Sequence, residues 1–259
     1  MILRRLSQSL KEQNWTAIWI EFILLVTGVF LGIQVSNWNA ERIANHKSQL
    51  YTERLRQDLD SEVWRYNALN EYYADVTDNA KKLLAALEGR AELSNEELLI
   101  AAYRATQYAE LAQYRETFDE LVSTGNLELI NDSAVRRMAI EIYNSKLYEN
   151  VKNEGINSPY RVEFRKIIPF NIQSAAASNC GDRPAQRGDF DFDKSNLRYE
   201  CKLGVPQREI DAAAQIIRTD EALLGLLRLR TANIYTAIST QMLSDEVKVK
   251  LKTIPEDKP

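Results

Sequence analysis

The sequence predicts an all-α protein in which one N-terminal transmembrane helix continues into a long helix and an extramembrane helical bundle. Two observations carry this prediction. An apolar run near the N-terminus is long enough to cross a bilayer, and the 259 residues include only nine Gly and six Pro. A β fold rich in hairpins would consume more of both residues in its turns. The formal net charge of -4 gives no reason to expect a nucleic-acid partner.

The membrane segment is the run AIWIEFILLVTGVFLGIQVS at residues 17–36, which contains a single charge. About 20 residues at about 1.5 Å each span the roughly 30 Å hydrocarbon layer of a bilayer. Trp15 and Trp19 at one end and Trp38 at the other suit the headgroup interface. We therefore predict a transmembrane helix over 15–38, in contact with the lipid bilayer. The alternatives are a buried helix of a soluble protein and a cleaved signal peptide, although Val35 to Trp38 offer no small-x-small cleavage site.

The flanks and the cysteines indicate orientation. Arg4, Arg5 and Lys11 lie in the tail at 1–14, which is expected to remain cytoplasmic, although basic residues on the far side weaken this signal. The only two cysteines, Cys180 and Cys201, bracket a polar loop and predict a disulfide in a translocated domain at 39–253. The alternative is a pair of reduced thiols in a cytosolic domain.

A long helix should rise directly from the membrane, because residues 33–88 contain neither Gly nor Pro. Its apolar positions recur with a mean spacing of about 3.5 residues. They are Leu59, Val63, Tyr66, Leu69, Tyr73, Val76, Ala80, Leu83 and Leu87. This spacing fits a coiled coil between chains and an antiparallel bundle within one chain equally well. We favour the bundle, because further helices follow that can cover the stripe. Gly89 is expected to end the helix.

Further helices are predicted from their capping residues. A helix capped by Ser94 runs to about Tyr114, and a short one is stopped at Gly125. The next opens at Asp132 or Ser133 and runs to about Asn153, another runs from Ser158-Pro159 to before Pro169, and the last runs from Thr219 or Asp220 to near Lys252. Residues 254–259 form a C-terminal tail.

Residues 174–206 are predicted to form an irregular loop that contains a small β-hairpin held by the disulfide. The alternation Asp-Phe-Asp-Phe-Asp at 189–193 predicts one strand, and residues 197–202 predict the second. Asp189, Asp191, Asp193 and Glu200 also match positions 1, 3, 5 and 12 of a calcium loop. Lys194 replaces the glycine that such a loop needs at position 6, so we expect the hairpin and no metal or cofactor.

Two stretches, EFILLVTGVFLGIQVSNWNAER and TFDELVSTGNLELIND, resemble a family of uncharacterised bacterial single-pass membrane proteins defined as a domain of unknown function. The matching residues are Glu21, Gly28, Gln34, Asn37, Trp38 and Asn39 in the first stretch, and Ser123, Gly125, Asn126 and Leu127 in the second. The resemblance covers under a fifth of the chain and does not include the cysteine loop. It implies a bacterial inner-membrane protein, so the domain is expected in the periplasm; it implies no activity.

Catalytic groups are scarce, because the only histidine, His46, has no partner at a recognisable spacing. We therefore predict that the protein is not an enzyme but a membrane-anchored, non-catalytic scaffold or interaction protein. One alternative is an oligomeric ion-conducting or sensing element lined by Glu21, Thr27 or Gln34. Another is a periplasmic enzyme that uses acidic residues of the cysteine loop. The sequence names no small-molecule ligand.

One face of the membrane helix combines a carboxyl group with two glycines. At 100° per residue, Glu21, Gly28 and Gly32 lie within about 40° of one another. Glycines four residues apart allow close helix packing, and a carboxyl inside lipid favours a protein contact. We predict a homo-oligomer or a membrane-protein partner at this face. The alternative is that Glu21 reaches the headgroups and that the glycines carry no packing role.

Overall fold

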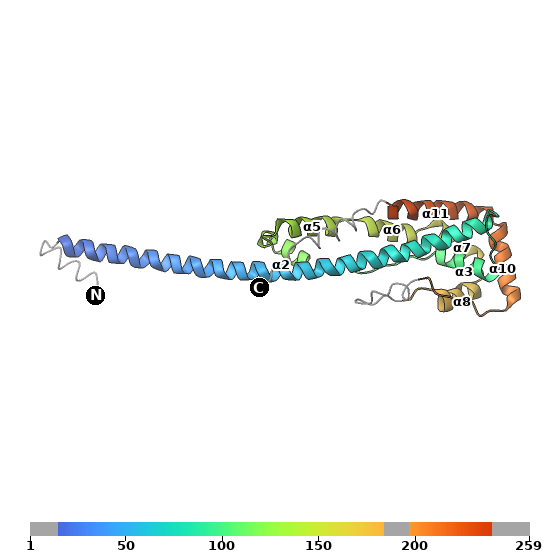
Figure 1. Ribbon diagram of the computed structural model, residues 1–259, viewed down its shortest axis with the longest axis horizontal. Coiled ribbons are helices and arrows are strands. Elements are labelled where there is room, and N and C mark those ends of the chain that lie inside the picture. Colours follow the sequence, from blue (N-terminus) through green and yellow to red (C-terminus); the bar gives the residue numbers. More distant parts are fainter. Residues whose placement is uncertain (1–14, 184–196, 240–259) are drawn as a thin grey trace.

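The computed structural model describes residues 15–183 and 197–239. Its longest element is α2, a single helix of 73 residues from Trp15 to Leu87. At about 1.5 Å per residue this helix is about 110 Å long. Figure 1 shows its N-terminal half extending away from the rest of the chain, while its C-terminal half forms the spine of a helical bundle.

The end of α2 follows from Gly89, as the sequence predicts. Gly89 has a φ of 72°, a left-handed conformation that favours glycine. Its N–H donates to Ala86 O (3.2 Å), and the next N–H, of Arg90, donates to Ala85 O (2.8 Å). These two bonds form a Schellman motif, which satisfies carbonyls that the helix end leaves open.

Shorter helices surround the C-terminal half of α2 (Figure 1). They are α3 (Asn95–Ala105), α4 (Glu116–Ser123), the 3₁₀ turn η1 (Leu127–Leu129), α5 (Ser133–Asn144), α6 (Leu147–Ile156), α7 (Pro159–Ile167), α8 (Phe170–Cys180), α10 (Gln207–Thr219) and α11 (Glu221–Ser239). The all-α prediction is confirmed for the described residues, in which no strand occurs.

Two hydrophobic cores lie along α2. The core nearer the exposed half of α2 joins Leu55, Leu59 and Val76 to α4 and α5. The distal core joins Ala80 and Leu83 to α3, α7, α8, α10 and α11. The apolar stripe predicted on this helix is therefore covered by helices of the same chain, which is the arrangement that we favoured over pairing between chains.

Several capping predictions are confirmed. Ser94 and Glu97 form the expected capping box at α3, and the Asp132 side chain accepts from Ala134 N and Val135 N at the start of α5. Gly125, with a φ of 69°, follows α4. Asp220 accepts from Leu223 N (2.7 Å) at the start of α11.

Other boundaries differ from the prediction. The second helix ends at Ala105, not near Tyr114, and residues 106–115 form a non-helical segment that we name the central strap. The helix from Ser133 stops at Asn144, and α6 begins after a break at 145–146. Both α8 and α10 are additional helices that the prediction lacked.

The predicted β-hairpin is not seen in the described residues. Its first strand, at 189–193, lies outside them. Its second strand would lie in residues 197–203, which we name the cysteine strap and which form no strand. The reason is that backbone groups of the strap bond to side chains: Leu197 N donates to Asp75 (3.1 Å), and Leu203 N donates to Glu96 (2.7 Å).

Candidate functional site

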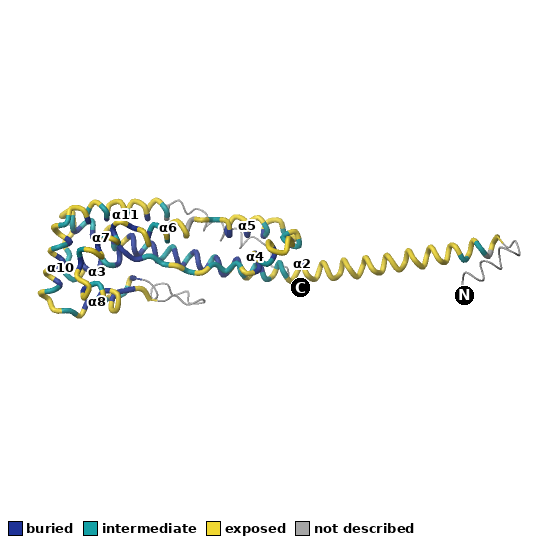
Figure 2. Tube along the Cα trace, turned by 180° about the vertical axis from the view of Figure 1, so that it is seen from behind, coloured by how far each residue is buried: buried dark blue, intermediate teal, exposed yellow. Residues whose placement is uncertain are grey.

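The exposed half of α2 is one candidate surface. Every residue from 22 to 47 in this helix is exposed, including Leu24, Val29 and Phe30 (Figure 2). α2 is also long and apolar enough to cross a membrane, by length and composition, near its N-terminal end. Apolar side chains in this number at the surface of a helix mark contact with lipid or with protein.

The predicted packing residues lie on this exposed segment. A Cβ atom built on Gly28 or Gly32 would meet no atom within 4 Å. Glu21 is half-buried, and its Oε2 has no hydrogen-bond partner among the described residues. The residues proposed to line a polar path, Thr27 and Gln34, are both exposed, as is His46.

The bundle contacts α2 beyond this exposed segment. Its first contact is at Ser48, whose hydroxyl donates to Leu129 O (2.5 Å), and Leu55 and Leu59 are fully buried. The Glu21, Gly28 and Gly32 face therefore lies before the part of α2 that the domain covers.

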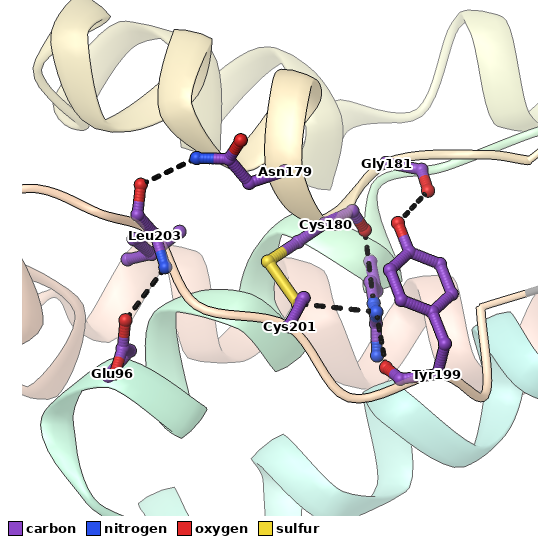
Figure 3. The surroundings of a disulfide bond; sticks show 8 residues. Glu96, Asn179, Cys180, Gly181, Tyr199, Cys201 and Leu203 are labelled. Carbon is purple, nitrogen blue, oxygen red and sulfur yellow. Dashed lines mark hydrogen bonds between the residues drawn. A yellow bond between two sulfur atoms is a disulfide. The ribbon is translucent and has the colours of Figure 1, made fainter.

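The cysteine strap is the second candidate region (Figure 3). Cys180, the last residue of α8, forms the predicted disulfide with Cys201, with 5.5 Å between the Cα atoms. Two further contacts hold the strap to α8: Asn179 Nδ2 donates to Leu203 O (2.8 Å), and the Tyr199 hydroxyl donates to Gly181 O. The disulfide thus lies within a hydrogen-bonded segment.

Two buried charges of the helices also reach this strap. Asp75 of α2, with a side chain that is 0% exposed, accepts from Leu197 N (3.1 Å) and from the Arg198 side chain. Burial raises the pKa of Asp75 above its ordinary value, and Arg198 opposes the shift. Arg104 of α3 donates to Cys180 O (3.2 Å), Tyr199 O (3.0 Å) and Cys201 Sγ (3.4 Å).

The central strap is bonded in the same way by side chains of the surrounding helices. Arg230 of α11, only 1% exposed, donates to Gln107 O (2.8 Å) and pairs with Glu154. Burial lowers the pKa of Arg230 to about 10. The Tyr73 hydroxyl donates to Ala109 O (3.1 Å). A strap without helical hydrogen bonds needs such partners, because buried backbone groups left unpaired are costly.

Two surface clefts adjoin these straps. One, of about 450 Å³, lies between the central strap and the α5–α6 corner, and its lining includes Arg65, Arg115, Tyr143 and Lys152. The three cations named here already form ion pairs: Arg65 with Glu62, Arg115 with Asp119, and Lys152 with Glu110. The other cleft, of about 690 Å³, lies between α3 and the cysteine strap, and Cys201 lines it.

Of the four acidic residues that match a calcium-loop spacing, the structure describes one. Asp189, Asp191 and Asp193 lie outside the described residues, and Glu200 is exposed at the 690 Å³ cleft. Within the described ranges no group of three or more His, Cys, Asp or Glu residues is placed to hold a metal ion.

Sequence reasoning missed the buried charges that hold the straps. Arg104 and Arg230 each stand on the apolar face of a helix, Arg230 between Leu227 and Ile234. An arginine at such a position is a readable signal, because charged side chains are almost never fully buried unless they are paired. No known protein family matches the chain, and neither a curated protein nor a solved structure matches it.

Proposed function

We propose that this protein is a membrane-anchored, non-catalytic interaction protein, in which α2 both anchors the helical domain and holds it at a fixed distance from the bilayer. The observation that carries the proposal is the continuity of α2 from Trp15 to Leu87. The same helix that presents an exposed apolar segment also supplies residues to both cores of the bundle. Any movement of the anchor is therefore transmitted to the domain.

The distance follows from helix geometry. Between the end of the apolar run at Ser36 and the first domain contact at Ser48 lie residues 37–47, all exposed. Roughly eleven residues at 1.5 Å each make a stalk of about 16 Å. Residues 33–88 include no Gly or Pro that would bend it. The domain would stand clear of the headgroups, with its sides open to a partner.

A non-catalytic role is supported by the fact that the buried charged side chains bond to backbone groups. Asp75, Arg104 and Arg230 bond to strap backbone, and Glu62 bonds to the Tyr114 N–H (2.5 Å). Groups bound in this way maintain the shape of the domain. A rigid domain of defined shape is what a binding surface requires.

The anchor is tested with Val26→Lys combined with Phe30→Lys, because these exposed side chains contact no other part of the fold. Two charges near the centre of the segment should move the protein from the membrane fraction into the alkaline-carbonate extract. Thermal unfolding of the domain should not change. If the parent protein is itself extracted by carbonate, the anchor proposal is wrong.

We further propose that a second copy of this chain packs against the Glu21, Gly28 and Gly32 face. Two features support this: two glycines open to close approach, and a carboxyl oxygen without a partner among the described residues. A partner that met this face would shield the carboxyl from lipid.

The oligomer is tested with Gly28→Ile and Gly32→Ile in one chain, reconstituted in lipid and cross-linked through the stalk. The matched control is Val26→Ile with Phe30→Ile, which places the same two side chains roughly 140° to 180° around the helix from Glu21. Cross-linking should fall several-fold in the glycine variant only. Equal cross-linking in both variants and the parent would contradict close packing at this face.

For location, we propose the bacterial inner membrane, with the N-terminus in the cytoplasm and the domain in the periplasm. The Cys180–Cys201 disulfide supports this orientation, because disulfides persist in oxidising compartments. A membrane-impermeant thiol reagent, added to intact cells after mild reduction, should label Cys201, which is partly exposed. Labelling only after lysis would reverse the topology.

A further inference from the structure

A buried cation lies directly beside the disulfide. Arg104 is 7% exposed, and its guanidinium donates to a carbonyl on each side of the bond, Cys180 O and Tyr199 O, as well as to Cys201 Sγ. Figure 3 shows the disulfide between the two cysteine-bearing segments that these acceptors belong to. The guanidinium also lies over the Tyr199 ring, with its central carbon 4.8 Å from the ring centroid.

No carboxylate in the described part of the chain forms an ion pair with this cation, although the charge of Asp75 acts on it from beyond ion-pair distance. The ion pairs there join other arginines and lysines to carboxylates, and no described carboxylate lies within ion-pair distance of Arg104. Burial lowers the pKa of Arg104 below its ordinary value, because a charge out of water is unfavourable. An anion beside the guanidinium would relieve this cost.

The two sulfurs differ in access. Cys180 is 0% exposed, whereas Cys201 is partly exposed and lines the cleft of about 690 Å³ between α3 and the cysteine strap. An external thiolate can therefore approach Cys201 and is blocked from Cys180. Accessibility decides which sulfur of a disulfide is attacked.

We propose that Cys201 is a thiol–disulfide exchange site, at which Arg104 serves as the counter-ion of the Cys201 thiolate and the reactant is an external thiol. In the first step an external thiolate attacks Cys201 Sγ; the Cys180–Cys201 bond breaks, and its electron pair leaves on Cys180, which takes a proton from water. In the second step another external thiolate attacks the external sulfur of the mixed disulfide. The products are the oxidised external disulfide and the Cys201 thiolate, which Arg104 neutralises.

The exchange is reversible without loss of the fold, because other contacts hold the cysteine strap. Asp75 bonds Leu197 N, Glu96 bonds Leu203 N, and Asn179 bonds Leu203 O. Reduction removes the covalent link and leaves these hydrogen bonds to keep Cys201 near Cys180 and Arg104. The pair would therefore re-form when an oxidant returns.

The test is the equilibrium between protein and glutathione, measured on the full-length protein in detergent. Samples at a series of reduced-to-oxidised glutathione ratios are acid-quenched and alkylated, and the fraction of reduced protein is measured by mass spectrometry. Arg104→Gln removes the charge and keeps part of the hydrogen bonding, and Arg104→Lys keeps the charge. A charge-assisted hydrogen bond to the thiolate predicts that Arg104→Gln is reduced at least about tenfold less readily than the parent. Arg104→Lys should stay within a few-fold of the parent.

A second measurement keeps the proposal falsifiable if Arg104→Gln loses its fold, which its circular dichroism would show. Cys180→Ser and Cys201→Ser each leave one thiol, and both are exposed to oxidised glutathione. The mixed disulfide should form at Cys201 at least tenfold faster than at Cys180. Equal rates at the two cysteines, or a reduction equilibrium that is the same for Arg104→Gln and the parent, would overturn the proposal.

Discussion

At the scale of single residues, the charged side chains inside this bundle bind backbone that lacks helical partners. Asp75, Arg104 and Arg230 come from three different helices, and each bonds to a strap. Their energetic role depends on the hydrogen bonds more than on the charge, because burying a charge is costly even when it is paired. A substitution that keeps the hydrogen bond and removes the charge should therefore cost less stability than one that removes both.

Asp75→Asn should change the free energy of unfolding little, because the amide oxygen still accepts from Leu197 N. Asp75→Ala leaves that buried N–H unpaired and should cost about 1 to 3 kcal/mol. Urea unfolding monitored by circular dichroism measures both. Asp78→Asn, at an exposed position one turn along α2, is the control. Equal losses from Asn and Ala would show that the charge, not the acceptor, matters.

The pH dependence of Asp75 has a definite sign. Burial raises its pKa in the folded state above the ordinary value of 3.8, so folding favours the protonated form. The stability that this group contributes is fully present below pH 3.8 and is lost as pH rises through the raised pKa. The parent should therefore lose stability relative to Asp75→Asn as pH rises from 3.8 toward neutrality. A gap that stays constant or changes the other way would refute this assignment.

Two glycines inside helices make a matched pair. A Cβ on Gly155 of α6 would lie 2.5 Å from Tyr108 Cβ, whereas a Cβ on Gly225 of α11 would meet nothing within 4 Å. Gly155→Ala should lower stability by about 1 to 3 kcal/mol through overpacking. Gly225→Ala should raise it by about 0.5 to 1 kcal/mol through helix propensity. Thermal unfolding of both variants checks the contrast, and a stabilising Gly155→Ala would contradict the tight contact.

At the scale of elements, α4 is capped by a different helix. Its N-cap residue, Arg115, makes no side-chain capping bond, and the N–H of Thr117 instead donates to Asp58 of α2 (2.9 Å). The cap is thus a tertiary contact. It fixes the short helix against the spine at the end of the central strap.

Asp58→Ala should therefore cost about 0.5 to 2 kcal/mol, the range for a lost helix cap. Asp60→Ala, at an exposed acidic residue two positions further along α2, should cost little. Urea unfolding of the two variants gives the comparison. Equal costs would mean that Asp58 acts only as surface charge.

Local signals predicted those elements whose ends are determined locally. Gly89, Ser94, Gly125 and Asp132 each mark a helix end through their own turn or cap. The central strap escaped prediction, because tertiary partners such as Arg230 and Tyr73 bond its carbonyls in place of helical partners. The missing strand of the cysteine strap has the same cause. The break at 145–146 escaped prediction as well. The disulfide was predicted from the cysteine count, and its arginine neighbour was not.

At the scale of the whole molecule, the bundle and the exposed apolar segment share one helix (Figures 1 and 2). The domain contacts α2 from Ser48 onward and leaves the preceding residues free on all sides. A continuous rod would set both the height and the rotation of the domain relative to a membrane. A flexible linker would set neither.

The most direct test of this account is spin-label accessibility along α2 in liposomes, with single cysteines placed from residue 22 to residue 50. The native cysteines are joined in the disulfide and do not react. Labels at Val26 and Phe30 should be reached by oxygen and not by a polar nickel complex, as in lipid. Labels at Arg42 and Asn45 should be reached by the nickel complex. If the nickel complex reaches Val26 and Phe30 as readily as Asn45, the segment lies in water and the anchored-rod account is wrong.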